Sequence, residues 1–220
     1  MNRRLSIATL AGLVTLANGP LAGQDSLPPI APDSVARAEL VDVKSLDSSI
    51  VVDARYFTSN NFTGAVLPGY EANKAFLRKE AATALARVQA RLRSRHLGLK
   101  IFDGYRPVRA TQAMVAWARR TDQYQLVTGG YIASRSRHNL GLAVDLTLVD
   151  LGTGKELDMG TPFDTFSDSA HWANATGAVM ENRQALRRAM ESEGFTQYDQ
   201  EWWHYSFSVP DPVPFDMVVE

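Results

Sequence analysis

The sequence predicts an α+β domain with an antiparallel-rich central sheet and flanking helices, because strand-like and helical patterns follow one another in mixed order. Residues 143–148 alternate and are rich in valine, leucine and threonine, which predicts a central strand. Apolar residues at helical spacing predict a helix over residues 79–94. The chain has 220 residues, 45% of them hydrophobic, which suits one globular domain with a sizeable core.

The first elements are predicted from local composition. Residues 24–34 contain three prolines and predict a linker without regular structure. Residues 50–56, IVVDARY, predict a strand, and the asparagines, glycines and proline of residues 59–69 predict a loop. The helix over residues 79–94 has arginines on the face opposite its apolar stripe, and we expect Gly98 to end it.

The middle of the chain alternates between strand and helix patterns. Residues 99–103 predict a short strand, after which Pro107 is expected to open a helix at its first turn. Residues 119–130 are polar and predict a surface loop. After the central strand over 143–148, a glycine-containing turn leads to an expected return strand over residues 156–159.

The last elements complete the prediction. Residues 160–172 predict an irregular segment, and residues 182–193 predict a helix that ends at Gly194. Residues 202–209 predict the final strand. The hairpin-like succession of strands favours antiparallel pairing.

The N-terminus has the pattern of an export signal. Arg3 and Arg4 precede an apolar run of 13 residues, 5–17, that is too short to span a bilayer comfortably. Ala22 and Gly23 are small residues at which a signal peptidase can cut, and the alternative is a buried N-terminal helix. We therefore expect an exported protein, periplasmic or secreted, without a membrane span in its mature form. The expected parts are a signal peptide at residues 1–23, an N-terminal extension or linker at residues 24–49, and the functional domain at residues 50–220.

Charge and cysteine content exclude several classes of partner and site. The formal net charge is -1, which gives no reason to expect nucleic acid or an anionic membrane surface as a partner. The chain contains no cysteine, so disulfides, thiolate metal sites and cysteine nucleophiles are excluded. No protein partner is predicted.

Two acid–histidine pairs are candidates for chemistry. Asp145 lies in a strand that we expect to be buried, where a carboxylate costs several kcal/mol unless it is paired or bound to a cation. His138 precedes it by seven residues, and Glu201 and His204 lie far downstream in EWWHY. Two histidines and an aspartate are three ligands for zinc with a fourth position open for water, and a nearby glutamate can act as a general base. The alternative is a pair of hydrogen-bonded core histidines with a capping aspartate.

The spacing within each pair constrains its geometry. His138 and Asp145 have an odd separation, so one straight strand would place them on opposite faces. We therefore expect His138 on the turn before the strand, where Gly141 lets the backbone bend back. We expect Glu201 at the entrance of the last strand, where a twist or bulge aims it and His204 inward.

Four motifs together resemble a known family. They are NFTG at 61–64, DGYRP at 103–107, S-x-H-x-x-G-x-A-x-D at 136–145 and E-x-x-H at 201–204. In this order they resemble the zinc-dependent D-alanyl-D-alanine dipeptidases of the kind found in vancomycin resistance. The likeness runs from about residue 50 to residue 205, which is most of the predicted functional domain. It implies one zinc ion per chain, in a cleft on the sheet, and a small D,D-dipeptide as the substrate.

The resemblance also implies a role for individual residues. The implied zinc ligands are His138, Asp145 and His204. The implied catalytic residues are Glu201 as acid/base and Arg106 as stabiliser of the transition state. The implied substrate contacts are Tyr56 and Asp164 at the dipeptide's amino group, and Ser136 and Tyr70 near its carboxylate. For Arg106, the residues alone leave a surface ion pair with Asp103 as the alternative.

Two features depart from the resistance dipeptidases, which act in the cytoplasm. This chain carries the export pattern, and its segment between Trp117 and Tyr131 is shorter than expected. An exported relative meets dipeptides released outside the cytoplasmic membrane, so the predicted function is hydrolysis of D-Ala-D-Ala and related dipeptides in cell-wall peptide turnover. The alternatives are a D,D-carboxypeptidase that trims peptidoglycan stem peptides and a non-catalytic, zinc-bearing module that binds wall peptides.

Overall fold

The computed structural model describes residues 29–220, so the predicted signal peptide at residues 1–23 lies outside the described residues. The strands are β1 (Leu40–Asp42), β2 (Val51–Val52), β3 (Phe76–Arg78), β4 (Leu97–Asp103), β5 (Ala143–Asp150), β6 (Thr196–Gln197) and β7 (His204–Ser206). The α-helices are α1 (Asp33–Glu39), α2 (Val43–Leu46), α3 (Lys79–Arg93), α4 (Val108–Arg120), α5 (Gln125–Thr128) and α6 (Gly177–Glu191). The 3₁₀ turns are η1 (Arg55–Phe57), η2 (Arg137–Leu140) and η3 (Asp168–Ala170).

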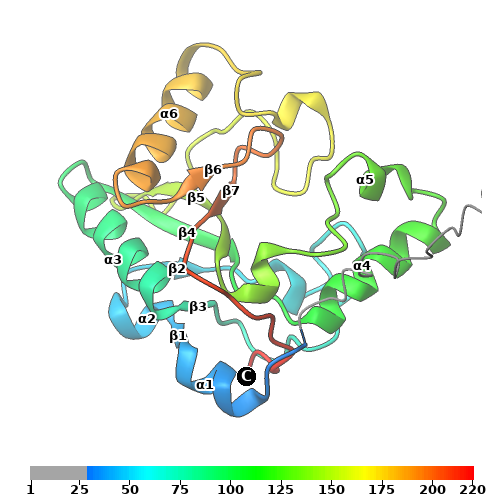
Figure 1. Cartoon of the computed structure of the whole chain (residues 1–220). Coiled ribbons are helices and arrows are strands. Elements are labelled where there is room, and N and C mark those ends of the chain that lie inside the picture. The colour runs from blue at the N-terminus through cyan, green and yellow to red at the C-terminus, as the bar shows by residue number, and fades with distance from the viewer. Residues whose placement is uncertain (1–28) are drawn as a thin grey trace, which may run out of the picture.

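A five-stranded sheet in the order β2-β4-β5-β7-β6 forms the centre of the domain, with α3 and α6 on one side and α4 and α5 on the other (Figure 1). All its pairings are antiparallel except that of β2 with β4. A second, two-stranded sheet pairs β1 with β3. The predicted single α+β domain with an antiparallel-rich sheet and flanking helices is therefore confirmed.

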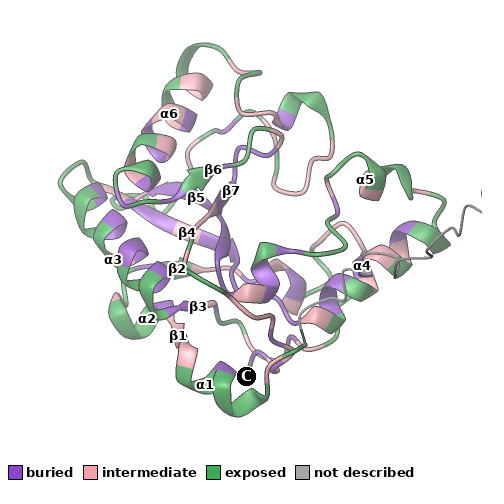
Figure 2. Ribbon diagram, viewed as in Figure 1, coloured by how far each residue is buried: buried purple, intermediate pink, exposed green. Residues whose placement is uncertain are grey.

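The central strand β5 separates the core from the candidate site. Its even-numbered residues Val144, Leu146 and Leu148 belong to the same apolar cluster as the buried faces of α3 and α6. Because side chains alternate along a strand, Asp145 and Thr147 point to the opposite face. Figure 2 shows buried residues along β4 and β5 and exposed residues on the outer faces of α3 and α6.

Helix α3 follows the predicted pattern. Its apolar stripe, which includes Leu85 and Val88, is fully buried against the sheet. The helix ends at Arg93 rather than near Gly98, because the chain turns through His96 in the left-handed region (φ 57°) and Gly98 already lies in β4.

The segment predicted as an extension or linker over residues 24–49 is folded from residue 33 onward. Helix α1 begins at Asp33, and β1 pairs with β3 so that Leu40 lies opposite Arg78. Ala36 and Leu40 are buried in one apolar cluster and Val43 in the other. The segment is part of the domain because its few apolar side chains complete both cores.

Three predicted strands are shorter than expected, and the final one, predicted over residues 202–209, is regular only over His204–Ser206. The strand over residues 50–56 is regular only over Val51–Val52, because η1 then turns the chain and buries Tyr56. The return strand over residues 156–159 is reduced to a single bridge between Val149 and Glu156. None of the helices in residues 29–220 has the length and apolar character that a membrane span requires.

Candidate active site

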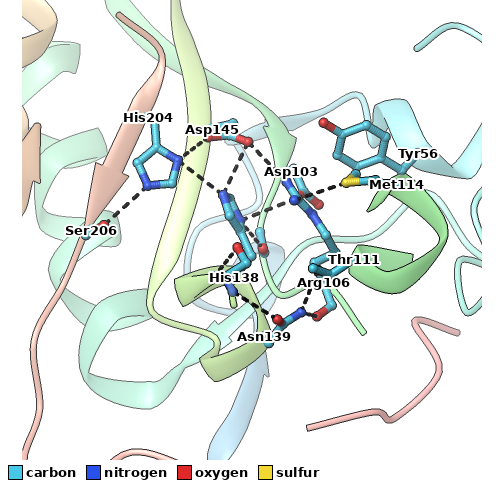
Figure 3. Close-up of polar contacts among 12 residues, drawn as sticks. Tyr56, Asp103, Arg106, Thr111, Met114, His138, Asn139, Asp145, His204 and Ser206 are labelled. Atoms are coloured by element: carbon cyan, nitrogen blue, oxygen red, sulfur yellow. Dashed lines mark hydrogen bonds and ion pairs between the residues drawn. The ribbon is translucent and has the colours of Figure 1, made fainter. Parts of the chain in front are cut away.

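Three side chains from separate elements converge at the start of β5. His138 lies on η2, Asp145 on β5 and His204 at the start of β7, and one ligand atom from each lies within 4.8 Å of the others. His204 Nδ1 is 2.9 Å from Asp145 Oδ1, and His138 Nε2 is 3.4 Å from Asp145 Oδ2 (Figure 3). The two ring nitrogens are 3.3 Å apart.

The local fold that brings them together follows from the sequence. Gly141 adopts a left-handed conformation (φ 66°) at the end of η2, as expected for the turn that precedes the strand. An added Cβ there would lie 2.5 Å from a Leu40 side-chain carbon, so a larger residue would require Leu40 to move and would be strained at this φ. In the β5–β7 pair, Asp145 lies directly opposite His204. The antiparallel pairing of β5 with β7 therefore brings Asp145 and His204, two of the three candidate ligands, next to each other.

The donor set fits a metal ion. His138 Nδ1 lies 2.7 Å from the carbonyl oxygen of Gly104, which favours the tautomer whose Nε2 lone pair faces Asp145. His204 Nε2 lies 3.3 Å from Ser206 Oγ, a hydroxyl that can accept from an Nε2–H and is therefore compatible with a lone pair on Nδ1. Two imidazole nitrogens and a carboxylate oxygen are ligands that divalent transition metals accept. The three residues can therefore hold one metal ion.

The protonation states agree with that donor set. Burial alone would raise the pKa of Asp145, but His138 and His204 hold the pKa of this carboxyl well below its ordinary value. Burial lowers the pKa of His204, although Asp145 opposes the shift. An anionic carboxylate beside a neutral imidazole is the state that binds a metal.

Glu201 lies beside the three candidate ligands, before β7. Its Oε2 is 3.9 Å from His204 Nδ1, and its backbone carbonyl accepts a hydrogen bond of 3.0 Å from Gln197 Nε2. Burial, followed by the charges of Asp145 and Asp164, raises the pKa of Glu201 well above its ordinary value, while Arg106 opposes the shift. A buried carboxyl with a raised pKa is a candidate for general acid/base catalysis.

Arg106 is buried rather than on the surface. It does pair with Asp103, because its Nε and Nη2 lie 2.9 and 2.8 Å from Asp103 Oδ2, but only 8% of the residue is exposed. Its Nη2 is also 3.7 Å from Asp145 Oδ2, and its guanidinium lies 5.0 Å from the ring centre of Tyr56 (Figure 3). Burial alone would lower the pKa of Arg106, but Asp103 raises it well above the ordinary value. The site therefore contains a fixed positive charge.

The three candidate ligands, Glu201 and Arg106 line a cavity of about 380 Å³. Three of the four residues matched to substrate contacts line it, namely Tyr56, Ser136 and Asp164. The Tyr56 hydroxyl donates to Asp164 Oδ1 at 3.1 Å, and burial together with the charge of Asp145 raises the pKa of Asp164 to about 8. The Ser136 hydroxyl accepts from the backbone N–H of His138 at 3.2 Å, which fixes the start of η2.

Tyr70 is placed differently from the prediction. It is not among the described residues that line the cavity, and only 4% of it is exposed. Its hydroxyl donates to Asp103 Oδ1 at 2.6 Å, so it lies behind Arg106 rather than beside a substrate. A direct contact with the substrate carboxylate is therefore not supported by this geometry.

Sequence reasoning missed several aromatic residues of the cavity wall, among them Tyr131 and Tyr198. Tyr131 and Tyr198 both line the cavity, and both come from irregular segments. Tyr131 lies 2.9 Å from His171 Nε2 through its hydroxyl oxygen, and Tyr198 packs edge-on against the ring of His204. Neither residue belongs to a periodic pattern, so the sequence offers no signal for their positions.

Comparison with known proteins identifies the family. The family model described as Peptidase_M15, D-ala-D-ala dipeptidase, matches residues 36–214 and so begins within α1. A D-alanyl-D-alanine dipeptidase of Enterococcus faecalis is 39% identical over 177 residues, which cover 74% of this chain and 87% of that protein. One of Escherichia coli is 34% identical over 185 residues, which cover 83% and 90%.

Among solved structures, a vancomycin resistance D,D-dipeptidase, VanXYg, in complex with a D-Ala-D-Ala phosphinate analog aligns with a TM-score of 0.42 and 19% identity, over 78% of this chain and 67% of that one. The matched family model spans most of the described chain, including all three candidate metal ligands. The chain therefore belongs to the Peptidase_M15 family of D-Ala-D-Ala dipeptidases, which are metallopeptidase hydrolases.

Proposed function

We propose that this protein is a zinc-dependent hydrolase of D-Ala-D-Ala and related dipeptides, and that it acts outside the cytoplasmic membrane in cell-wall peptide turnover. The observation that carries the proposal is the convergence of His138, Asp145 and His204 in one cavity with Glu201 and Arg106. Three protein ligands leave a coordination position open, which is the arrangement of catalytic rather than structural zinc sites. The family membership supplies the substrate class.

The proposed mechanism assigns proton transfer to Glu201. Zinc bound by the three ligands would polarise the scissile carbonyl and lower the pKa of a water molecule toward 7. Glu201 takes a proton from the attacking water and delivers it to the leaving amine. Its raised pKa favours proton uptake from the attacking water, and the same carboxyl can then return the proton to the amine. A positioned acid/base of this kind contributes about 10² to 10⁴ in rate.

Arg106 is proposed to stabilise the negative charge that develops on the carbonyl oxygen. Its Nε and Nη2 are engaged by Asp103, whereas its Nη1 faces the sulfur of Met114 at 3.3 Å, a weak acceptor. An oxyanion is a far stronger acceptor than a thioether. A fixed guanidinium in a buried site therefore favours the transition state over the uncharged substrate.

Asp164 and Tyr56 are proposed to hold the free amino group of the dipeptide. The Asp164 carboxylate lines the cavity and is oriented by the Tyr56 hydroxyl. An ammonium group placed against it makes a charge-assisted hydrogen bond. An acylated amine cannot make this bond and needs additional space, so the arrangement favours free dipeptides over the ends of longer peptides.

A substrate panel tests the proposed activity. The purified mature protein is incubated with D-Ala-D-Ala, its L,L isomer, its N-acetylated form and a wall pentapeptide that ends in D-Ala-D-Ala, and release of D-Ala is measured. We expect rapid hydrolysis of the free D,D-dipeptide alone. Equally fast hydrolysis of the pentapeptide would establish the carboxypeptidase alternative. Binding of wall peptides without any hydrolysis would establish the binding-module alternative.

Export is a separate part of the proposal. It rests on the charged start, apolar run and small residues of positions 1–23, which lie outside the described residues. Mass spectrometry of the protein isolated from its native host should find a mature N-terminus near Ala22 or Gly23. An intact Met1 in a soluble cytosolic fraction would contradict export and with it the role in turnover outside the membrane.

A further inference from the structure

A buried chain of polar side chains runs from Tyr70 to the guanidinium of Arg106. Tyr70 packs edge-on against Tyr56 with ring centres 5.9 Å apart, and its hydroxyl donates to Asp103 Oδ1 at 2.6 Å. The other oxygen of Asp103 accepts from Nε and Nη2 of Arg106. Oδ1 thus accepts from the hydroxyl, whereas Oδ2 accepts from the guanidinium and also lies 3.4 Å from His138 Nδ1.

The backbone of β4 places Asp103 for this role. The β4–β5 register shifts between Ile101 and Asp103, and the shift brings Asp103 opposite Asp145. Two buried carboxylates facing each other repel unless a cation lies between them. Arg106 Nη2 is 2.8 Å from Asp103 and 3.7 Å from Asp145, so the guanidinium bridges the pair. The bulge therefore creates the position that the guanidinium occupies.

We propose that Tyr70 and Asp103 are positioning residues that fix the guanidinium of Arg106 beside the metal centre, and that Tyr70 makes no contact with the substrate. The inference rests on the transition-state role proposed for Arg106. It replaces the role in binding the substrate carboxylate that the family resemblance implies for Tyr70.

The geometry explains why one hydroxyl matters. A hydrogen bond from Tyr70 to Oδ1 stops the Asp103 carboxylate from rotating, so Arg106 is held by Oδ2 alone. Without that hydroxyl, Oδ1 is left buried without its donor. The carboxylate then turns toward the guanidinium and accepts from it with both oxygens, which draws Arg106 away from the cavity. Displacement of a catalytic group by about 1 Å can cost about 100-fold in rate.

The test compares Tyr70→Phe with Tyr105→Phe. Tyr105 is a matched control because it is also buried, and its hydroxyl donates to the carbonyl of Met217 at 2.8 Å, away from Asp103. For Tyr70→Phe we expect kcat on D-Ala-D-Ala to fall about fivefold, with KM unchanged within about twofold, because the lost interaction acts on the transition state. Tyr105→Phe should change neither constant by more than about twofold. A Tyr70→Phe variant with raised KM and unchanged kcat would overturn the proposal, because that result describes a substrate contact.

Asp103→Asn provides a second, stronger perturbation. Asparagine keeps the shape but removes the charge that holds the guanidinium, so kcat should fall about 100-fold while KM changes little. Full kcat in this variant would contradict the positioning role of Asp103.

An NMR measurement on the protein does not depend on activity. The Nε–H signal of Arg106, assigned by its loss in Arg106→Lys, should shift in Tyr70→Phe and remain in place in Tyr105→Phe. An unchanged signal in Tyr70→Phe would contradict the proposal. A wild-type protein that hydrolyses none of the substrate panel would contradict the proposed function instead, and the Nε–H comparison would then decide the positioning of Arg106 by itself.

Discussion

Replacement of Asp164 by alanine should selectively weaken hydrolysis of the free dipeptide. The carboxylate lines the cavity, is oriented by Tyr56 at 3.1 Å and lies in a confined space of about 380 Å³. A hydrogen bond to a charged group, here the ammonium of the dipeptide, contributes about 1.5–3 kcal/mol. At about 1.4 kcal/mol for each factor of ten, kcat/KM for D-Ala-D-Ala should fall about 10- to 100-fold.

The assay measures kcat/KM for D-Ala-D-Ala and for its N-acetylated form in the wild type and in Asp164→Ala. The acetylated substrate has no ammonium group, so its rate should change little and the preference for the free dipeptide should shrink. Asp168→Ala is a matched control, because it removes the carboxylate of an aspartate that lies four residues further on, at the start of η3, and whose side chain is 89% exposed. Equal loss on both substrates in Asp164→Ala would refute the reasoning and remove Asp164 from recognition.

Three further outcomes follow from the same geometry. Glu201→Gln keeps the shape of the side chain but cannot take a proton, so it should bind metal normally and lose about 10²- to 10⁴-fold in kcat; near-normal turnover would mean that another group is the base. Metal analysis should find about one zinc ion per wild-type chain and none in the double variant Asp145→Ala, His204→Ala; full occupancy in the double variant would contradict the ligand assignment. In the metal-free protein the pKa of Asp164 is raised to about 8, whereas in the unfolded chain this carboxyl loses its proton near pH 4. The contribution of Asp164 to the free energy of unfolding therefore falls as the pH rises from about 4 to 8. The Asp164→Asn variant should therefore have a higher melting temperature than the wild type, and the difference should grow over that pH range. If both proteins show the same dependence of melting temperature on pH, the raised pKa of Asp164 is excluded.

The parts of the fold that the sequence predicts are those set by local patterns. The stripe of Leu85 and Val88 locates α3, because burial of one helical face requires that spacing. The odd separation of His138 and Asp145, together with Gly141, predicts the turn that brings the two side chains together. Both arguments use only residues that lie within seven positions of one another in the sequence.

The parts that escaped prediction depend on contacts between distant segments. Tyr70 acquires its partner, Asp103, from a strand 33 residues away, and no local pattern distinguishes such a tyrosine from one that faces a cavity. The expected return strand over residues 156–159 is replaced by an irregular path, because Arg183 of α6 donates to the carbonyls of Met159, Ser169 and His171. No pattern in the sequence indicates that a buried arginine holds the segment that contains Asp164 through hydrogen bonds.

Zinc titration of the metal-free protein tests most directly whether the three converging side chains form the hydrolytic centre. D-Ala release from D-Ala-D-Ala should be absent after chelation and should rise with added zinc to a plateau at about one equivalent per chain. Hydrolysis that persists without metal, or a zinc-loaded protein that does not cleave the dipeptide, would contradict this account.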